Sequence, residues 1–487
     1  MLVSIFIGLC AIGGGLPFVL RDRRMLRVGT YTWSTAVFGV GAFAGLSGLT
    51  EPSLLWNGFL YLDAFGGLLV MLISFMQWTA VLASVSHLEH ELEEGTITLR
   101  KARLYMALLS LFVLAMAVSI LANNLGVLWI ALEATTLATT FLVAFYAKPG
   151  SLEAAWKYLI LCSTGIAFGL IGLLLAYYAA QGSGTEVTLN WKDLLALGST
   201  LPPQLMQLAF IFVLIGYGTK AGLAPMHAWL PDAHSAAPAP ISGLLSGILL
   251  PVALTAVLRF KLIVDASLGG NDWTGWLLII FGVISVLIAA AFILVQHDYK
   301  RLLAYSSIEH MGIISILFGI SGLAAVAGVI HLVGHALIKS GLFYGAASIV
   351  ERFKTTKFEN VAGIARALPH TALLFLIGML ALLAAPPSPL FLSEYVLVAQ
   401  TVVMHPLVLA FALFALTVIA AGFIRQLIRF LYSRHAPHEH ALAPRESWTV
   451  AHGGIALHYL LVAALGIALW TPQGFAAAQH IAQVLLK

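Results

Sequence analysis

The chain has 487 residues, of which 60% are hydrophobic and only 9% are charged, and its formal net charge is +4 at pH 7. Together with a mean hydropathy of +0.96, this composition is typical of a helical protein that crosses a lipid bilayer many times. It excludes a soluble enzyme with a large core. The charge is too small to indicate a nucleic-acid partner.

Apolar runs of spanning length predict an all-α, polytopic membrane protein with about 14 transmembrane helices. The first run has neither a basic region ahead of it nor a clear small-residue cleavage site, so we interpret it as a retained helix and not as a signal peptide. In chain order the runs lie near residues 1–20, 28–47, 59–86, 104–123, 125–146, 157–180, 204–229, 239–264, 273–296, 302–320, 324–350, 371–403, 406–432 and 452–470.

Lysines and arginines are concentrated in alternate loops of this arrangement. Eighteen of the 25 lie in one set of loops and only four in the other. Because basic loops stay in the cytoplasm, this distribution predicts a multi-pass membrane protein with both termini outside.

The stretch from Gly216 to Pro240 places a lysine in an apolar helix and then breaks that helix. We expect Gly216, Gly218, Gly222 and Pro225 to interrupt the span near mid-membrane depth, where irregular backbone survives only beside protein or a water-filled cavity. A charge at that depth costs at least about 2.5 to 3.5 kcal/mol, so Lys220 is a candidate for an ion or proton pathway. The alternative is a lysine that snorkels to the interface.

A second interrupted span lies in the C-terminal half. Pro386, Pro387 and Pro389 precede Glu394 there, and prolines remove amide donors and kink helices. Paired broken helices are typical of inverted-repeat transporters. We therefore divide the chain into N-terminal helices (1–103), a first five-helix repeat (104–264), a second five-helix repeat (273–432) and a C-terminal loop with the last helix (433–487).

Two further groups of the first half stand out. Glu133 is the only charge in its span, so its carboxylate needs a partner: either a neutral hydrogen bond to Thr135, Thr136 or Thr139, or a functional pairing with a lysine. Lys157 begins the next span, where it is a candidate functional cation or a residue that snorkels and pairs with Glu153 at i−4.

His331, His335 and Lys339 recur at i, i+4 and i+8, which puts them on one helical face. Such a stripe is a candidate proton relay, since histidine changes charge near neutral pH. The alternatives are hydrogen-bonded structural histidines and a zinc site, for which no third ligand is evident.

Other polar residues lie near the spans. Asp298, Lys300 and Arg301 are most simply topogenic, loop-fixing residues. Glu309 and His310 enter the next span as neighbours that point to different sides of a helix. Candidates for proton entry are His227, Asp232, His234, Glu309 and His310. The first three lie in the turn after the broken helix and could equally be turn and helix-cap residues.

The sequence predicts neither a bound cofactor nor a metal site in this chain. Cys10 and Cys162 stand far apart, whereas an iron–sulfur cluster needs about four ligands. No glycine-rich phosphate loop follows a strand. Redox chemistry would therefore belong to partner subunits.

The motif KAGLAPMHAWLPDAH resembles the seventh-helix signature of the proton-translocating, antiporter-like membrane subunits of respiratory complex I and of membrane-bound hydrogenases. The family's H-x-x-x-H-A-x-x-K pattern matches His331, His335 and Lys339, and SSIEHMG resembles the hydrogenase subunits more. The resemblance implies that Glu133 pairs with Lys220 and that Glu394 is the exit-side proton carrier. It also implies a bacterial or archaeal cytoplasmic (inner) membrane as the location. The chain departs from the pattern at Pro251, where related complex I subunits have a lysine.

Three functions follow as expectations. The first is a proton-translocating subunit of a membrane-bound hydrogenase or formate hydrogenlyase, assembled with other membrane and peripheral subunits. The second is a subunit of a complex I-like quinone oxidoreductase or of a Na+/H+ antiporter, and the third is a translocation-inactive scaffold. The residues expected to carry protons are Glu133, Lys157, Lys220, His331, His335, Lys339 and Glu394.

Overall fold

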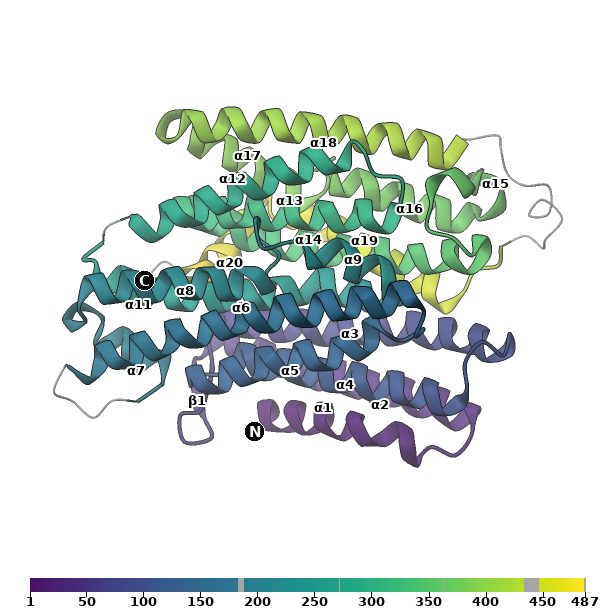
Figure 1. Cartoon of the computed structure of the whole chain (residues 1–487), viewed down its shortest axis with the longest axis horizontal. Coiled ribbons are helices and arrows are strands. Elements are labelled where there is room, and N and C mark those ends of the chain that lie inside the picture. The colour runs from purple at the N-terminus through teal and green to yellow at the C-terminus, as the bar shows by residue number, and fades with distance from the viewer. Residues whose placement is uncertain (183–187, 271, 362, 433–445, 486–487) are drawn as a thin grey trace.

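The computed structural model describes residues 1–182, 188–270, 272–361, 363–432 and 446–485, and these are almost entirely helical. The long helices run side by side across the molecule, from α1 and α2 at one side to α12, α17 and α18 at the other (Figure 1). Within the described residues, 11 helices are long and apolar enough to cross a membrane. The other three predicted spans correspond to α2, to α8 and to the pair α16 and α17, so the all-α polytopic prediction is confirmed.

The N-terminal part forms one side of the molecule. A short antiparallel hairpin, β1 and β2, pairs Ser53 with Leu62 and separates the second and third helices. Asp63 caps the third helix by accepting a hydrogen bond from Gly66 N. The elements are α1 (Leu2–Val19), α2 (Arg23–Thr50), β1 (Ser53–Leu55), β2 (Leu60–Leu62), α3 (Ala64–Glu93) and α4 (Leu99–Leu121).

The next part contains the first broken helix. The break follows Lys220, and irregular turns occupy residues 221–228 before the chain becomes helical again. A π-helical turn ends at Leu249, two residues before Pro251, so the winding of the helix changes just ahead of this proline. The helices are α5 (Leu125–Val143), α6 (Pro149–Gln181), α7 (Trp191–Ala196), α8 (Pro203–Lys220), α9 (Trp229–Ala236), α10 (Ala239–Leu244), the π-turn (Leu245–Leu249) and α11 (Leu250–Ser267), with a 3₁₀ turn at Gly198–Thr200.

One detail of the first break differs from expectation. The helix does not stop at Gly216 or Gly218 but runs through both to Lys220. A Cβ on Gly216 would lie 2.4 Å from Gly169 N and 2.7 Å from Gly165 O on α6. This glycine therefore serves close packing between α6 and α8, whereas Gly222, with φ +76°, is the one that turns the chain.

The last part contains the second break, residues 383–388, which follows the expectation from the prolines. A further short helix, α20, follows the last span and packs on α3 and α14. The helices are α12 (Trp273–Ile293), α13 (Tyr299–Ile320), α14 (Leu323–Phe353), α15 (Ile364–Ala367), α16 (Pro369–Leu382), α17 (Pro389–Met404), α18 (Pro406–Tyr432), α19 (Val450–Ala468) and α20 (Pro472–Ala482), with 3₁₀ turns at Phe358–Asn360 and Gln483–Leu485.

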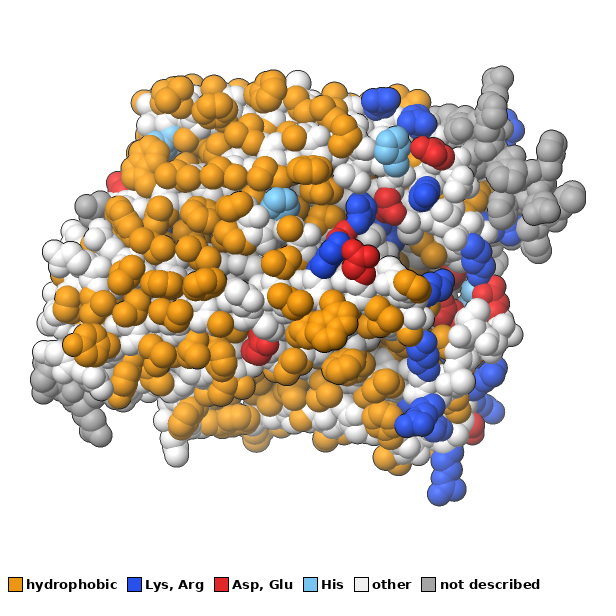
Figure 2. All heavy atoms as spheres, in the orientation of Figure 1, with side chains coloured by type: hydrophobic (Ala, Val, Ile, Leu, Met, Phe, Trp, Pro, Cys, Tyr) orange, Lys and Arg blue, Asp and Glu red, His pale blue; other side chains and the backbone are white. Residues whose placement is uncertain are grey.

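Helix α14 is the centre of this part. It packs against α10, α13, α16, α17 and α19, and most of its 31 residues are buried. Figure 2 shows apolar side chains over most of the visible face and lysines and arginines gathered at one end of the helices. That distribution is what a membrane protein with its basic loops on one side requires.

Candidate functional site

Lys220 lies fully buried at the end of α8. Its ammonium group donates hydrogen bonds to Thr136 Oγ1 at 2.8 Å and to Tyr158 OH at 2.6 Å, and it lies 4.8 Å from the centre of the Tyr158 ring. The indole of Trp229 on α9 donates to Thr219 O at 2.8 Å and so satisfies a carbonyl freed by the break. The charge is thus held in a polar pocket inside the protein and does not snorkel.

Glu133 on α5 is near Lys220 but not in direct contact with it. Its Oε1 accepts a hydrogen bond of 2.6 Å from Ser163 Oγ, while its buried Oε2 has no partner among the described residues. Glu133 therefore makes neither the predicted hydrogen bond to a threonine nor a direct ion pair with Lys220. Thr136 accepts a hydrogen bond from Lys220, and Thr135 and Thr139 donate to helix carbonyl groups.

Lys157 differs from Lys220 in its surroundings. Its side chain is 49% exposed and forms ion pairs with Glu153 at 2.7 Å and Asp232 at 3.2 Å. Asp232 also binds Arg301. The three residues Lys157, Asp232 and Arg301 line a cavity of about 550 Å³ at the basic end of the helices, so Lys157 lies at a solvent mouth and not in the buried series.

The predicted histidine stripe is buried inside the second half. His331, His335 and Lys339 are each 0% exposed. His335 Nε2 lies 3.2 Å from Ser246 O, and Lys339 donates to Leu303 O and to Ser306 Oγ. The single-face prediction is confirmed, and the face points at α13 and the π-turn.

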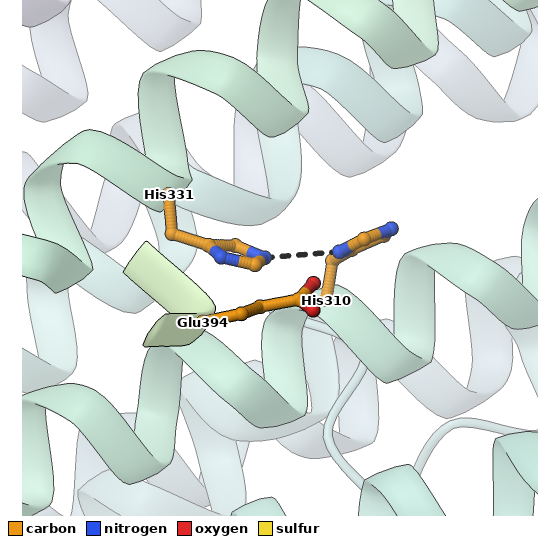
Figure 3. Close-up of side chains that lie close together, drawn as sticks. All are labelled: His310, His331 and Glu394. Carbon is orange, nitrogen blue, oxygen red and sulfur yellow. Dashed lines mark hydrogen bonds between the residues drawn. The ribbon is translucent and has the colours of Figure 1, made fainter. Parts of the chain in front are cut away.

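His310 changes the interpretation of this stripe. The sequence put it among entry residues with no expected interaction, yet its Nδ1 lies 2.9 Å from His331 Nε2, as Figure 3 shows. His331 Nδ1 in turn lies 2.8 Å from Ser393 Oγ on α17. Spacing along one helix could not reveal this contact, because α13 and α14 supply one imidazole each.

Glu394 on α17 completes the cluster. Ligand atoms of His310, His331 and Glu394 all lie within 4.8 Å of one another, and Figure 3 shows the carboxylate reaching toward His310. This group of three possible metal ligands is not the predicted His331–His335 pair with a third ligand, because it contains His331 without His335. The His310–His331 hydrogen bond also occupies the two facing nitrogen atoms. We interpret the cluster as a hydrogen-bonded network. Glu309 and Glu394 both line a cavity of about 420 Å³ beside it.

Some polar residues of the interior were missed or misjudged. Tyr158 and Ser163 carry no sequence signal, because hydroxyl groups are common in helices. Lys300, interpreted from sequence as topogenic, is only 3% exposed and donates to Ser235 O and Ala237 O at the end of α9. His458 on α19 bridges Thr79 and Leu337 O, each at 2.9 Å. His227 is half-buried, with no partner for its Nδ1 in the described part of the chain.

These features define a class of protein: an antiporter-like helical membrane subunit with two broken helices and a buried polar axis. The profile described as NADH:quinone oxidoreductase/Mrp antiporter, transmembrane, matches residues 122–420. The chain belongs to this family.

Among its relatives, the hydrogenase-4 component F homolog of Methylacidiphilum infernorum is 38% identical over 382 residues, which covers 78% of this chain and 80% of the relative. Hydrogenase-4 component B of Escherichia coli is 30% identical over 69% of this chain, and formate hydrogenlyase subunit 3 of the same organism is 32% identical over 59%. The match spans about half the length of those two longer proteins, 50% and 47%.

Solved structures show the same fold. A chain of an archaeal membrane-bound sulfane sulfur reductase superposes with a TM-score of 0.87 at 23% identity and covers 100% of this chain and 98% of its own. A chain of the Mrp complex of Dietzia sp. gives 0.83 at 18% identity, with 99% and 97% covered. One of complex I from Thermus thermophilus gives 0.73 at 24% identity, with 96% and 97% covered.

Proposed function

We propose that this chain is the proton-translocating membrane subunit of an energy-converting oxidoreductase complex of the membrane-bound hydrogenase or formate hydrogenlyase type. Its partners would be the redox-active peripheral subunits and other membrane subunits, which hold all electron-transfer cofactors. The resemblance to hydrogenase-4 components supports the subtype.

The observation that carries the proposal is the His310–His331 pair beside Glu394. Two imidazoles 2.9 Å apart share one proton, since one ring must donate and the other accept. A proton that arrives at His310 Nε2, which has no partner among the described residues, releases the Nδ1 proton to His331. Glu394 is then within reach as the next acceptor, and the cavity beside it is the exit.

Variants of the second half test this path. In the purified complex reconstituted into vesicles, we expect His331→Gln and Glu394→Gln to lower the number of protons moved per electron at least tenfold, because each removes a group that both binds and releases a proton. Assembly should persist, since the changes are nearly isosteric. His297→Gln is the control, because His297 is exposed and pairs only with Glu359 at the surface. A wild-type proton-to-electron ratio in both site variants would refute the relay.

The second candidate is a subunit of a complex I-like oxidoreductase or of a Na+/H+ antiporter, favoured by the Mrp and complex I folds. Neighbouring genes separate the two. Genes for hydrogenase large and small subunits beside this one support the first function, and an isolated multisubunit antiporter cluster supports the second. A scaffold without translocation is disfavoured by the cost of burying so many titratable groups.

A further inference from the structure

His234, at the end of α9, is a buried imidazole that the path described above does not use. It is 0% exposed, and its ring stacks on Phe343 with centroids 5.3 Å apart. Neither ring nitrogen makes a hydrogen bond of good geometry within the described ranges, although the backbone of Ser242 lies close enough to interact with the ring. Leaving a buried donor or acceptor unpaired costs about 1 to 3 kcal/mol, so we expect ordered water at the ring nitrogen that the Ser242 backbone does not serve.

The residues around His234 connect it to a cavity on one side and to the histidine stripe on the other. On one side, Lys300 donates to the carbonyl of Ser235, the residue next to His234. On the other, the ammonium nitrogen of Lys339 lies 5.6 Å from the centre of the Phe343 ring on which His234 stacks. Lys300 lines the cavity of about 550 Å³ at the basic end, together with Ser235 and Ala237. Lys339 belongs to the histidine stripe. His234 thus stands between an open cavity and the buried relay.

The route through the first half is less direct. Lys220 is enclosed by Thr136 and Tyr158, and Pro251, which cannot bind a proton, lies between it and the stripe in sequence. The π-turn beside Pro251 contributes only a backbone carbonyl, Ser246 O, to His335. His234 is therefore the polar side chain that the described contacts place between the cavity at the basic end and Lys339.

We propose that a water-filled route runs from the cavity at the basic end past Lys300 and His234 to Lys339, and that it loads the second half with protons directly. His234 is a positioning residue: it holds the water and does not itself carry the proton. The part of the inference that concerns proton loading rests on the proposed function, whereas the presence of water does not.

Thiol labelling tests whether the route is wet. His234→Cys is made in a Cys10→Ser, Cys162→Ser background, in which the two native thiols are removed. A small, membrane-impermeant methanethiosulfonate is added from the side of the basic loops. We expect labelling at least tenfold faster than for Leu244→Cys, whose position is buried among apolar side chains. Equal rates would overturn the inference, whether or not the complex pumps.

Replacement of the ring tests whether the route carries protons. His234→Phe keeps the stacking surface but binds no water, and we expect it to lower the proton-to-electron ratio at least fivefold. His234→Gln keeps a donor and an acceptor and should restore at least half of the wild-type ratio. Labelling at position 234 combined with wild-type pumping by His234→Phe would overturn the loading route while leaving the proposed function intact. If His234→Phe and His234→Gln lower the proton-to-electron ratio equally, His234 has a packing role, and the loading route is overturned as well.

Discussion

At the residue scale, Lys220 shows how an intramembrane charge is made tolerable. The ammonium group has three donors, of which two are used by Thr136 and Tyr158. The ammonium nitrogen lies at the hydroxyl edge of the Tyr158 ring, 4.8 Å from the ring centre, so the phenol oxygen is the main contact that Tyr158 makes with the charge.

We therefore expect Lys220→Met to lower proton pumping more than Tyr158→Phe does. Lys220→Met removes the charge and should abolish the contribution of the first half to pumping. Tyr158→Phe keeps the ring and loses one acceptor, so it should lower the rate by about two- to tenfold. Proton uptake by reconstituted vesicles is the measurement. An effect of Tyr158→Phe as large as that of Lys220→Met would contradict this interpretation.

A second residue-scale prediction concerns Glu446, which lies before α19 and outside the spans. Its carboxylate accepts hydrogen bonds from His370 N and from Thr371, and it pairs with His452 at 3.0 Å. Burial works against its ionisation, but the hydrogen bonds from His452 and Thr371 outweigh burial and lower the pKa of Glu446.

A carboxylate with a lowered pKa stabilises the fold above the pKa of the unfolded chain, about 4.3, and loses that contribution as the pH falls through the folded value. Glu446→Gln should therefore lower the thermal midpoint in detergent at pH 7, by the equivalent of about 1 to 3 kcal/mol. The difference from wild type should shrink below about pH 4.5. A difference that is the same at both pH values would rule out the ionised carboxylate as the cause.

At the element scale, the two breaks were predictable and their internal contacts were not. Gly222 and the prolines indicated the two breaks, because these residues act on the local backbone, whereas Gly216 and Gly218 did not end α8. The His310–His331 bond and the buried position of Lys300 depend on how α9, α13 and α14 pack. One-helix periodicity carries no information about such packing. The division into two repeats stays a prediction.

Close packing of α6 on α8 is itself testable. A methyl group on Gly216 would meet backbone atoms of Gly165 and Gly169, which cannot move as a flexible side chain can. Gly216→Ala should cost about 1 to 3 kcal/mol and displace Lys220 from Tyr158, which lowers pumping as well as stability. Gly8→Ala is the matched control, since a methyl group there would meet no neighbouring atom within 4 Å. Thermal unfolding of both variants in detergent is the measurement, and equal midpoints would refute the packing argument.

At the scale of the whole molecule, electron transfer and proton movement are expected to be separate. Only two cysteines are present in the sequence, both free and buried. His331 and His335 lie on one helical face and cannot act as opposite axial ligands of one haem.

The purified chain should consequently show no haem, flavin or iron–sulfur absorbance and no hydrogenase, formate or NADH activity by itself. Absorption spectra and iron analysis of preparations free of partner subunits provide the check. Stoichiometric iron or flavin there would contradict the separation and would reopen the metal interpretation of the His310 cluster.

The position of the histidine stripe along α14 has an electrical consequence. His331 and Lys339 are eight residues apart on one helix, which is about 12 Å of axial rise. The hydrocarbon core is about 30 Å thick. For a helix that lies near the membrane normal, the step from Lys339 to His331 therefore spans roughly two-fifths of the voltage drop across the core. Moving one proton along the stripe against a membrane potential of 100 mV therefore costs about 0.9 kcal/mol. This single step should make turnover of the complex slow down as the membrane becomes energised.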